Sequence, residues 1–296
     1  MIPSLCLYAS QLASCIGHNR FKKSSDALEL VWQRVAPHSF SEALRRNGLF
    51  TVDDAVERIA SANQVVRHLL VEAEATASAT SGDVAASYEE ASRQLAAAPN
   101  LTPEEHKLVD DAMKKTLYTS FGNRQEDAVF QYIRERHPCV LDDTFYKRHL
   151  MDVDGVPVFI GGRIDAISED GSTILEIKNR INRLFFKIPT YEHIQVLAYL
   201  FAVPHASRAT LVECITRDNG SLLTHAVPIH WDDAFWEDVV VSRVRNFVRL
   251  LLKILRDPVA QDTYLKNPRR ATHVAYAIAG KSLPRERSEK NIQNAV

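Results

Sequence analysis

The sequence predicts an α/β protein in which a mixed β-sheet is flanked by helices. Two runs rich in β-branched residues, 158–167 and 173–178, are separated by Glu-Asp-Gly-Ser, which is typical of a hairpin turn. A second pair of runs, 209–216 and 222–229, surrounds Asp-Asn-Gly and predicts a second hairpin that extends the sheet. Apolar residues recur at helical spacing through 231–255 and through several segments nearer the N-terminus. Strand pairs combined with amphipathic helices place the chain in the mixed α/β class.

The composition is ordinary for a globular protein, but the charge is unevenly distributed. The 296 residues can bury one large core or two smaller ones, and the formal net charge is −1. Residues 51–113 carry twelve acidic and four basic residues, whereas 177–191 contain four basic residues and no acid. Because a local basic patch is enough to steer a protein to nucleic acid, the low net charge does not exclude that partner.

Neither secretion nor membrane insertion is predicted. The mildly apolar residues 2–16 are interrupted by polar residues and lack a basic start, which argues against a signal peptide. No apolar run approaches the roughly 20 residues that span a bilayer. The four cysteines are scattered without a C-x-x-C pair, so a zinc site is not expected. We expect an intracellular, soluble protein with reduced thiols, located in the cytoplasm or nucleus of the host if it is viral or eukaryotic.

Helices are predicted from apolar periodicity together with start and stop signals. Ser10 is a candidate N-cap, as are Thr51, followed by acidic residues, and Thr102, followed by proline and two glutamates. Residues 75–87 are small and polar and predict a flexible loop, and the chain beyond Asp257 predicts a loosely structured basic segment. The predicted helices cover residues 8–17, 25–36, 51–68, 88–98, 102–118, 122–136, 190–200 and 231–255.

The first hairpin carries two carboxylates and an ammonium group. Glu176 and Lys178 project from the same face of the second strand because side chains two residues apart share a face. Folding the hairpin brings Asp165 near Glu176, and two such carboxylates suit a hard divalent cation that keeps several waters. This arrangement supports phosphodiester hydrolysis, with Lys178 positioning or deprotonating the attacking water. The alternative is a surface hairpin with a cross-strand charge pair, which is the better interpretation of an isolated E-x-K.

Five motifs stand in a definite order along the chain. They are Tyr8–Lys22, Phe121–Glu126 with its G-x-x-x-E pattern, Gly162-Arg163-Ile164-Asp165, Glu176-Ile177-Lys178 and Gln195-x-x-x-Tyr199. Together they resemble the PD-(D/E)XK nuclease superfamily, in particular its RecB-like and YqaJ-like or phage lambda exonuclease-like branch. One departure is that Ile164 stands where the superfamily's name has proline. The resemblance implies a restriction-endonuclease-like central mixed sheet flanked by helices, with a mostly helical N-terminal region.

The resemblance also implies a catalytic and metal-binding set. Glu126 would join Asp165, Glu176 and the backbone carbonyl of Ile177 around Mg²⁺, for which Mn²⁺ can substitute. Asp127 is the fallback for Glu126, whose alternative role is that of a first-turn carboxylate favoured by the helix dipole. The implied catalytic residues are Glu126, Asp165, Glu176, Lys178 and Gln195.

Contacts to DNA are expected from the N-terminal segment and from the basic stretch after Lys178. The expected residues are Ser10, Arg20, Lys22, Arg180, Arg183, Phe186, Lys187 and Tyr199. Basic residues interleaved with aromatic ones can contact phosphates and stack on bases. The alternatives are a helix cap for Ser10, a solvated basic turn around Arg20, and an apolar anchor beneath a solvated loop for the segment around Phe186.

The resemblance implies a metal-dependent DNA exonuclease of recombination, replication or repair, of viral or phage type. The alternatives are an endonuclease or ribonuclease of the same fold, and an inactive nucleic-acid-binding protein. Besides DNA, a single-strand annealing or replication protein is an expected partner. No iron–sulfur cluster is expected, because only Cys214 follows Lys178, and no nucleotide cofactor, because a Walker motif is missing. The expected regions are a mostly helical part, 1–118, packing on a nuclease core, 119–260, and a basic tail, 261–296.

Overall fold

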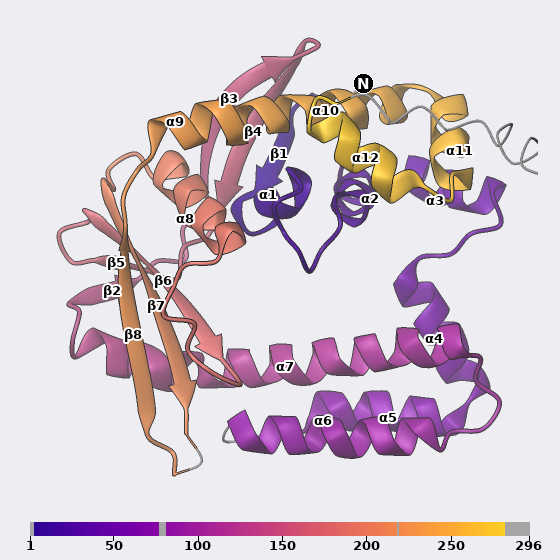
Figure 1. Cartoon of the computed structure of the whole chain (residues 1–296), viewed down its shortest axis with the longest axis horizontal. Coiled ribbons are helices and arrows are strands. Elements are labelled where there is room, and N and C mark those ends of the chain that lie inside the picture. The colour runs from indigo at the N-terminus through magenta and orange to yellow at the C-terminus, as the bar shows by residue number, and fades with distance from the viewer. Residues whose placement is uncertain (1–2, 77–80, 218, 282–296) are drawn as a thin grey trace, which may run out of the picture.

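The strands form two sheets with helices around them, which confirms the mixed α/β class (Figure 1). The computed structural model describes residues 3–76, 81–217 and 219–281, and the side chains of 81 and 121–128 are not described. The strands are β1 Leu5–Tyr8, β2 Cys139–Leu141, β3 Tyr146–Val153, β4 Val156–Gly162, β5 Ala166–Ser168, β6 Thr173–Arg180, β7 Arg208–Thr216 and β8 Leu222–Ile229. The helices are α1 Ala9–Cys15, α2 Ser24–Val35, α3 Pro37–Arg46, α4 Val52–Ala62, α5 Gln64–Ala75, α6 Ser81–Ala96, α7 Pro103–Arg134, α8 Thr190–Ala202, α9 Asp233–Phe235, α10 Ser242–Arg256, α11 Pro258–Lys266 and α12 Arg270–Ile278, with a π-helical segment, Trp236–Val241, between α9 and α10. No helix in the described ranges is long and apolar enough to cross a membrane.

The first sheet has the strand order β1-β4-β3 and the second has the order β2-β5-β6-β7-β8. β1 runs parallel to β4 and β6 runs parallel to β7, while the other neighbours are antiparallel. The predicted hairpin of β7 and β8 is confirmed. The prediction of one strand over 158–167 is wrong, because its first half pairs in the first sheet and its second half in the other. The single sheet expected from the sequence is therefore divided in two.

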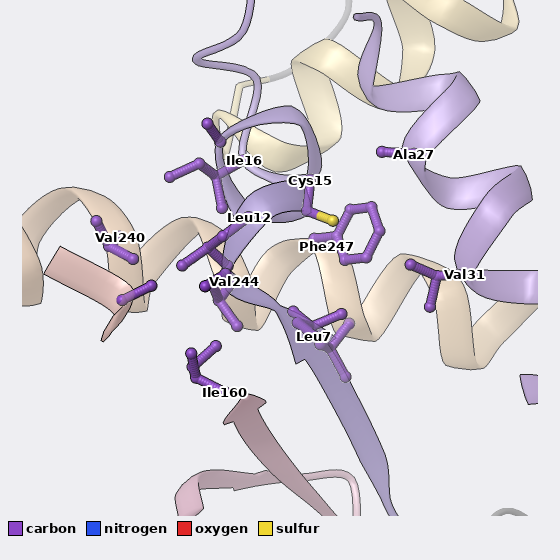
Figure 2. Close-up of a cluster of buried hydrophobic side chains, with 14 of the residues drawn as sticks. Leu7, Leu12, Cys15, Ile16, Ala27, Val31, Ile160, Val240, Val244 and Phe247 are labelled. Atoms are coloured by element: carbon purple, nitrogen blue, oxygen red, sulfur yellow. The ribbon is translucent and has the colours of Figure 1, made fainter. Parts of the chain in front are cut away.

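The main core lies between the first sheet and the helices of both chain ends. Figure 2 shows β1, α1, α2, β4 and α10 converging on one apolar cluster. Leu7 and Ile160 enter it from the sheet, and Phe247 enters it from α10; none of the three is accessible to solvent. The cluster also includes Tyr264 and Val274, on α11 and α12, so the predicted loose structure beyond Asp257 is wrong as far as the described residues extend.

A second group of helices, α4, α5, α6 and the first half of α7, has its own apolar clusters (Figure 1). The region expected as 1–118 thus contributes to two cores, since its first strand and helices belong to the main one. The predicted caps at Thr51 and Thr102 are confirmed, each as a reciprocal capping box. The helix predicted over 51–68 is interrupted at Asn63, which caps α5. In the predicted loop 75–87, residues from Ser81 onward are helical, and residues 77–80 lie outside the described ranges.

Helix α7 joins the helical group to the second sheet (Figure 1). The sequence predicts two helices here, but one helix of 32 residues runs from Pro103 to Arg134. Val109 packs in the helical group, whereas Val129 and Ile133 pack on Leu175 and other residues of the five-stranded sheet. A single element therefore links the helical group to the sheet that carries the candidate site.

Candidate active site

The chain crosses from one sheet to the other between β4 and β5, and Asp165 lies at this crossing. Gly162 ends β4 in close contact with two helices: a Cβ atom added there would lie 2.8 Å from Tyr199 Cε1 and 3.4 Å from Ala9 Cβ. Only a glycine allows the strand to approach both helices this closely. Pairing resumes at Ala166 in β5. Asp165, predicted to lie on a strand, instead stands in an exposed break between two strands.

Asp165 is held against the strand that carries the other predicted residues. Its Oδ2 accepts a hydrogen bond from the backbone N–H of Ile177 at 2.7 Å. Glu176 and Lys178 project from one side of β6, and Lys178 Nζ donates to Glu176 Oε1 at 2.5 Å. The structure thus brings together the two carboxylates and the ammonium group that the sequence singles out.

Gln195 connects α8 to this group. Its Nε2 donates to Glu176 Oε1 at 2.7 Å and to Tyr199 Oη at 3.2 Å, and its Oε1 accepts from Lys178 Nζ at 3.3 Å. The glutamine therefore fixes both members of the Glu176–Lys178 pair. Tyr199 is buried and supports Gln195, so its predicted contact with DNA is not compatible with its position.

Glu176 is a buried carboxylate with an incomplete set of partners. It is 2% exposed, and its Oε2 has no hydrogen-bond partner among the described residues. Burial raises the pKa of the Glu176 carboxyl to about 7, with Asp165 adding to the rise and Lys178 opposing it. Burial alone would lower the pKa of the Lys178 ammonium, but the Glu176 carboxylate overrides this and raises it. Two carboxylates therefore face one ammonium group.

These residues fit a divalent cation. Glu176 Oε2 accepts no hydrogen bond from the described residues, and the Glu176 carboxylate interacts electrostatically with Asp165. Mg²⁺ is commonly held by one or two carboxylates together with waters. The described residues contain no group of three or more His, Cys, Asp or Glu side chains arranged to hold a metal. Glu126 and its fallback Asp127 lie on α7, but outside the residues whose side chains the structure describes. Their place in the site, and that of the Ile177 carbonyl, stay predictions.

Arg180 has a structural position instead of the expected place among phosphate contacts. Its Nη1 lies 2.6 Å from Glu192 Oε1 and its Nη2 lies 2.7 Å from Glu213 Oε1. The Arg180 side chain is 10% exposed, and the two carboxylate side chains are 3% and 1% exposed. A guanidinium enclosed by two buried carboxylates is not available to DNA, because leaving them would expose two unpaired buried charges.

Glu213 also shapes the basic loop that follows β6. It accepts hydrogen bonds from the backbone N–H groups of Phe185 and Phe186, at 3.1 Å and 3.0 Å. Phe186 has a φ of 55°, an uncommon conformation for a residue with a side chain, and the residue is 66% exposed. The ring packs edge-on against His225, with centroids 5.0 Å apart. By fixing the backbone of the loop, the buried Glu213 carboxylate therefore holds the Phe186 side chain in a solvent-exposed position.

Four of the expected DNA contacts line one cavity of about 880 Å³. Arg183, Phe186 and Lys187 come from the basic loop, and Arg20 comes from the N-terminal segment more than 150 residues earlier. His18, Thr190 and Tyr191 complete its polar lining. The cavity thus combines cations with aromatic rings, which is the combination that binds a nucleic-acid strand.

The remaining expected contacts lie apart from this cavity. Ser10 is exposed on α1, but it is not the N-cap, which is Tyr8 and has no capping side-chain bond. Lys22 is exposed in the turn before α2, where its backbone N–H donates to Asn19. Both keep an accessible side chain, so their contacts with DNA stay predictions.

Sequence reasoning missed Glu192 and Glu213. Glu213 lies in the otherwise apolar run Leu-Val-Glu-Cys-Ile of β7, and an acid in a buried strand signals a buried cation partner. Glu192 gives no such signal, because an acid in the first turn of a helix is common on exposed surfaces.

Comparison with known proteins finds solved structures that are similar to part of this chain, and two of them are described here. No family model matches the chain, and no curated protein matches it. The crystal structure of SSO0001 aligns with 64% of this chain and 84% of its own, at 16% identity and a TM-score of 0.34. An alkaline exonuclease (LHK-Exo) from Laribacter hongkongensis aligns over the same shares, 64% and 84%, at 17% identity and a TM-score of 0.33. At these values the chain is similar to both proteins only in the course of part of its backbone.

Proposed function

We propose that this protein is a metal-dependent deoxyribonuclease that removes nucleotides from DNA ends. The observation that carries the proposal is the buried Glu176, which is bound to Lys178 and Gln195, interacts electrostatically with Asp165, and has an Oε2 without a partner among the described residues. A lone surface E-x-K pair has neither a buried carboxylate nor a helix residue fixed to both of its members. The motif order described above supports the same family of reactions.

Each residue has a definite task in hydrolysis. Asp165 and Glu176 would hold Mg²⁺, which supplies charge neutralisation at the scissile phosphate and acidifies a bound water. Lys178, partly exposed and fixed by Glu176 and Gln195, orients the attacking water and offsets negative charge that develops at the phosphate. Because both of its partners are themselves anchored, the ammonium group is held in place before the substrate arrives.

The substrate would contact the cavity of Arg20, Arg183 and Lys187. Three cations neutralise successive phosphates, and Phe186 stacks on a base. Arg180 is left out of this set because of its buried ion pairs. We assign the activity to recombination, replication or repair of viral or phage-type DNA, in an intracellular setting, on the strength of the sequence resemblance alone.

An exonuclease and an endonuclease of this fold differ in their need for a DNA end. With Mg²⁺ present, the protein should degrade a linear duplex and leave a relaxed closed-circular duplex of equal phosphate concentration intact. The Glu176→Gln protein, purified in the same way, controls for contaminating nucleases. Equal rates on linear and circular DNA would assign an endonuclease activity instead. In either case, removing Mg²⁺ should abolish whatever cleavage is observed.

A further inference from the structure

The first sheet has one covered face and one open face. Leu5, Leu7, Val158 and Ile160 point toward the main core and are fully buried. Helices α8 and α10 contact this sheet from the core side (Figure 1). The alternate residues of the same strands must point the other way, since successive side chains in a strand project to opposite faces.

Strand register aligns the outward residues in two rows. Tyr8, Gly161 and Lys147 are direct neighbours across β1, β4 and β3, and so are Cys6, Phe159 and His149. We define the open face as the outward side of these rows together with three flanking side chains. The flanking residues are Arg34, Phe145 and Arg163.

Aromatic rings on the open face are paired with cations. Lys147 Nζ lies 4.1 Å from the centroid of the Phe159 ring, and His149 packs edge-on against the same ring at 5.4 Å. Arg163 Cζ lies 5.6 Å from the centroid of Phe145. Such pairs keep a cation and an aromatic surface side by side at the protein surface.

Gly161 allows the Phe145 ring to approach the sheet closely. A Cβ atom added to Gly161 would lie 3.0 Å from two atoms of that ring. Phe145 in turn packs edge-on against Tyr8 at 5.8 Å, and the Arg34 guanidinium lies 3.8 Å above the Tyr8 ring. A continuous layer of rings and cations therefore runs across the sheet from α2 to the chain crossing.

The charge of the open face is positive. Lys147 and His149 lie exposed on β3, and Arg163 is exposed beyond the end of β4. His149 Nε2 lies 3.0 Å from Asp152 Oδ1 and is not counted among the cations, whereas Arg163 Nε donates to the Asp143 carbonyl oxygen and is not paired with a carboxylate there. Surfaces that bind single-stranded nucleic acid combine aromatic rings, on which bases stack, with cations that contact the phosphates.

We propose that the open face of the three-stranded sheet binds single-stranded DNA and leads it to the candidate active site. Arg163 is two residues before Asp165, so a strand on the face ends beside the crossing that carries this carboxylate. From Phe159 to Arg163 the chain advances four residues, about 13 Å of extended strand. The direction of travel rests on the proposed function, whereas binding itself does not.

The test measures binding of a fluorescent oligothymidylate of about 15 nucleotides by anisotropy, in EDTA so that hydrolysis does not interfere. The Lys147→Glu/Arg163→Glu protein should bind about tenfold more weakly. The slope of log affinity against log salt concentration should be smaller by about 1.4, since each lost phosphate contact on a single strand removes about 0.7. Phe159→Leu, which keeps apolar packing but removes the ring, should weaken binding about tenfold with the salt slope unchanged.

Two controls separate this site from other causes. Arg249→Glu/Lys253→Glu reverses two exposed cations one helical turn apart on α10 and should bind as the wild type does. A blunt duplex hides its bases, so Phe159→Leu should not alter duplex binding. Circular dichroism and thermal unfolding verify that each variant is folded.

Wild-type affinity in both Lys147→Glu/Arg163→Glu and Phe159→Leu would overturn the inference. This outcome is distinguishable from failure of the proposed function. If the wild type shows no Mg²⁺-dependent cleavage but the open-face variants lose oligonucleotide binding, the binding site stands and the nuclease assignment falls. If Mg²⁺-dependent cleavage is present but the open-face variants bind the oligonucleotide as the wild type does, the nuclease assignment stands and the binding site falls.

Discussion

Replacing Lys178 by alanine should reduce the rate of DNA hydrolysis by at least about 10²-fold, because a positioned general base or electrostatic stabiliser contributes that much. The loss should lie in the chemical step. Lys178 contacts Glu176 and Gln195 and is partly exposed, so its removal leaves the cavity around Arg183, proposed above to contact DNA, in place. Single-turnover cleavage of an end-labelled duplex at saturating Mg²⁺ measures the step, and DNA affinity measured in EDTA should change little.

The matched control for this variant is Lys253→Ala. Lys253 is an exposed lysine on α10, and its removal changes the net charge by the same amount. The Lys253→Ala protein should cleave DNA at the wild-type rate. If the Lys178→Ala protein cleaves DNA within about threefold of the wild-type rate, the lysine has no catalytic role, because a positioned acid or base contributes far more than that.

Replacing Arg180 by alanine should lower the free energy of unfolding by about 3–5 kcal/mol. The change leaves Glu192 and Glu213 charged and buried without their shared cation. For a chain of this size the corresponding drop in melting temperature is on the order of 10 °C. Thermal unfolding followed by circular dichroism measures the drop, and urea unfolding gives the free energy.

Arg183→Ala is the control for the effect of charge in the same segment. Arg183 is exposed on the loop, three residues after Arg180. Its removal should therefore change the free energy of unfolding by less than about 0.5 kcal/mol while weakening DNA binding. The opposite pattern, a stable Arg180→Ala protein with weakened DNA binding, would return Arg180 to the phosphate contacts first expected for it.

The sequence was sufficient to predict those features that depend on residues close together in the chain. The turn 169–172 is followed by β6 as predicted, and the capping boxes at Thr51 and Thr102 begin helices where threonine and the following acid predict them. The motif spacing also brought Asp165, Glu176 and Lys178 into one group, because strand alternation and a short hairpin determine their relative positions.

Features that depend on distant residues were not predictable in this way. The run 158–167 is uniformly rich in β-branched residues, and nothing within it shows that its halves pair with different sheets. Strand β1 pairs with β4, about 150 residues away, so its parallel position is set by tertiary contacts alone. Arg180 was assigned to DNA because its partners lie 12 and 33 residues further along the chain.

The account depends most on the claim that Asp165 and Glu176 hold a divalent cation. Calorimetric titration of Mn²⁺ into the wild-type protein should show a saturable site that is lost in the Asp165→Asn/Glu176→Gln protein. Because the pKa of Glu176 is about 7, a proton competes with the metal below neutrality, so affinity should fall about tenfold from pH 8 to pH 6. Equal affinity in the double variant and the wild type would contradict the claim, whereas its loss together with Mg²⁺-dependent cleavage would establish these two carboxylates as the metal site.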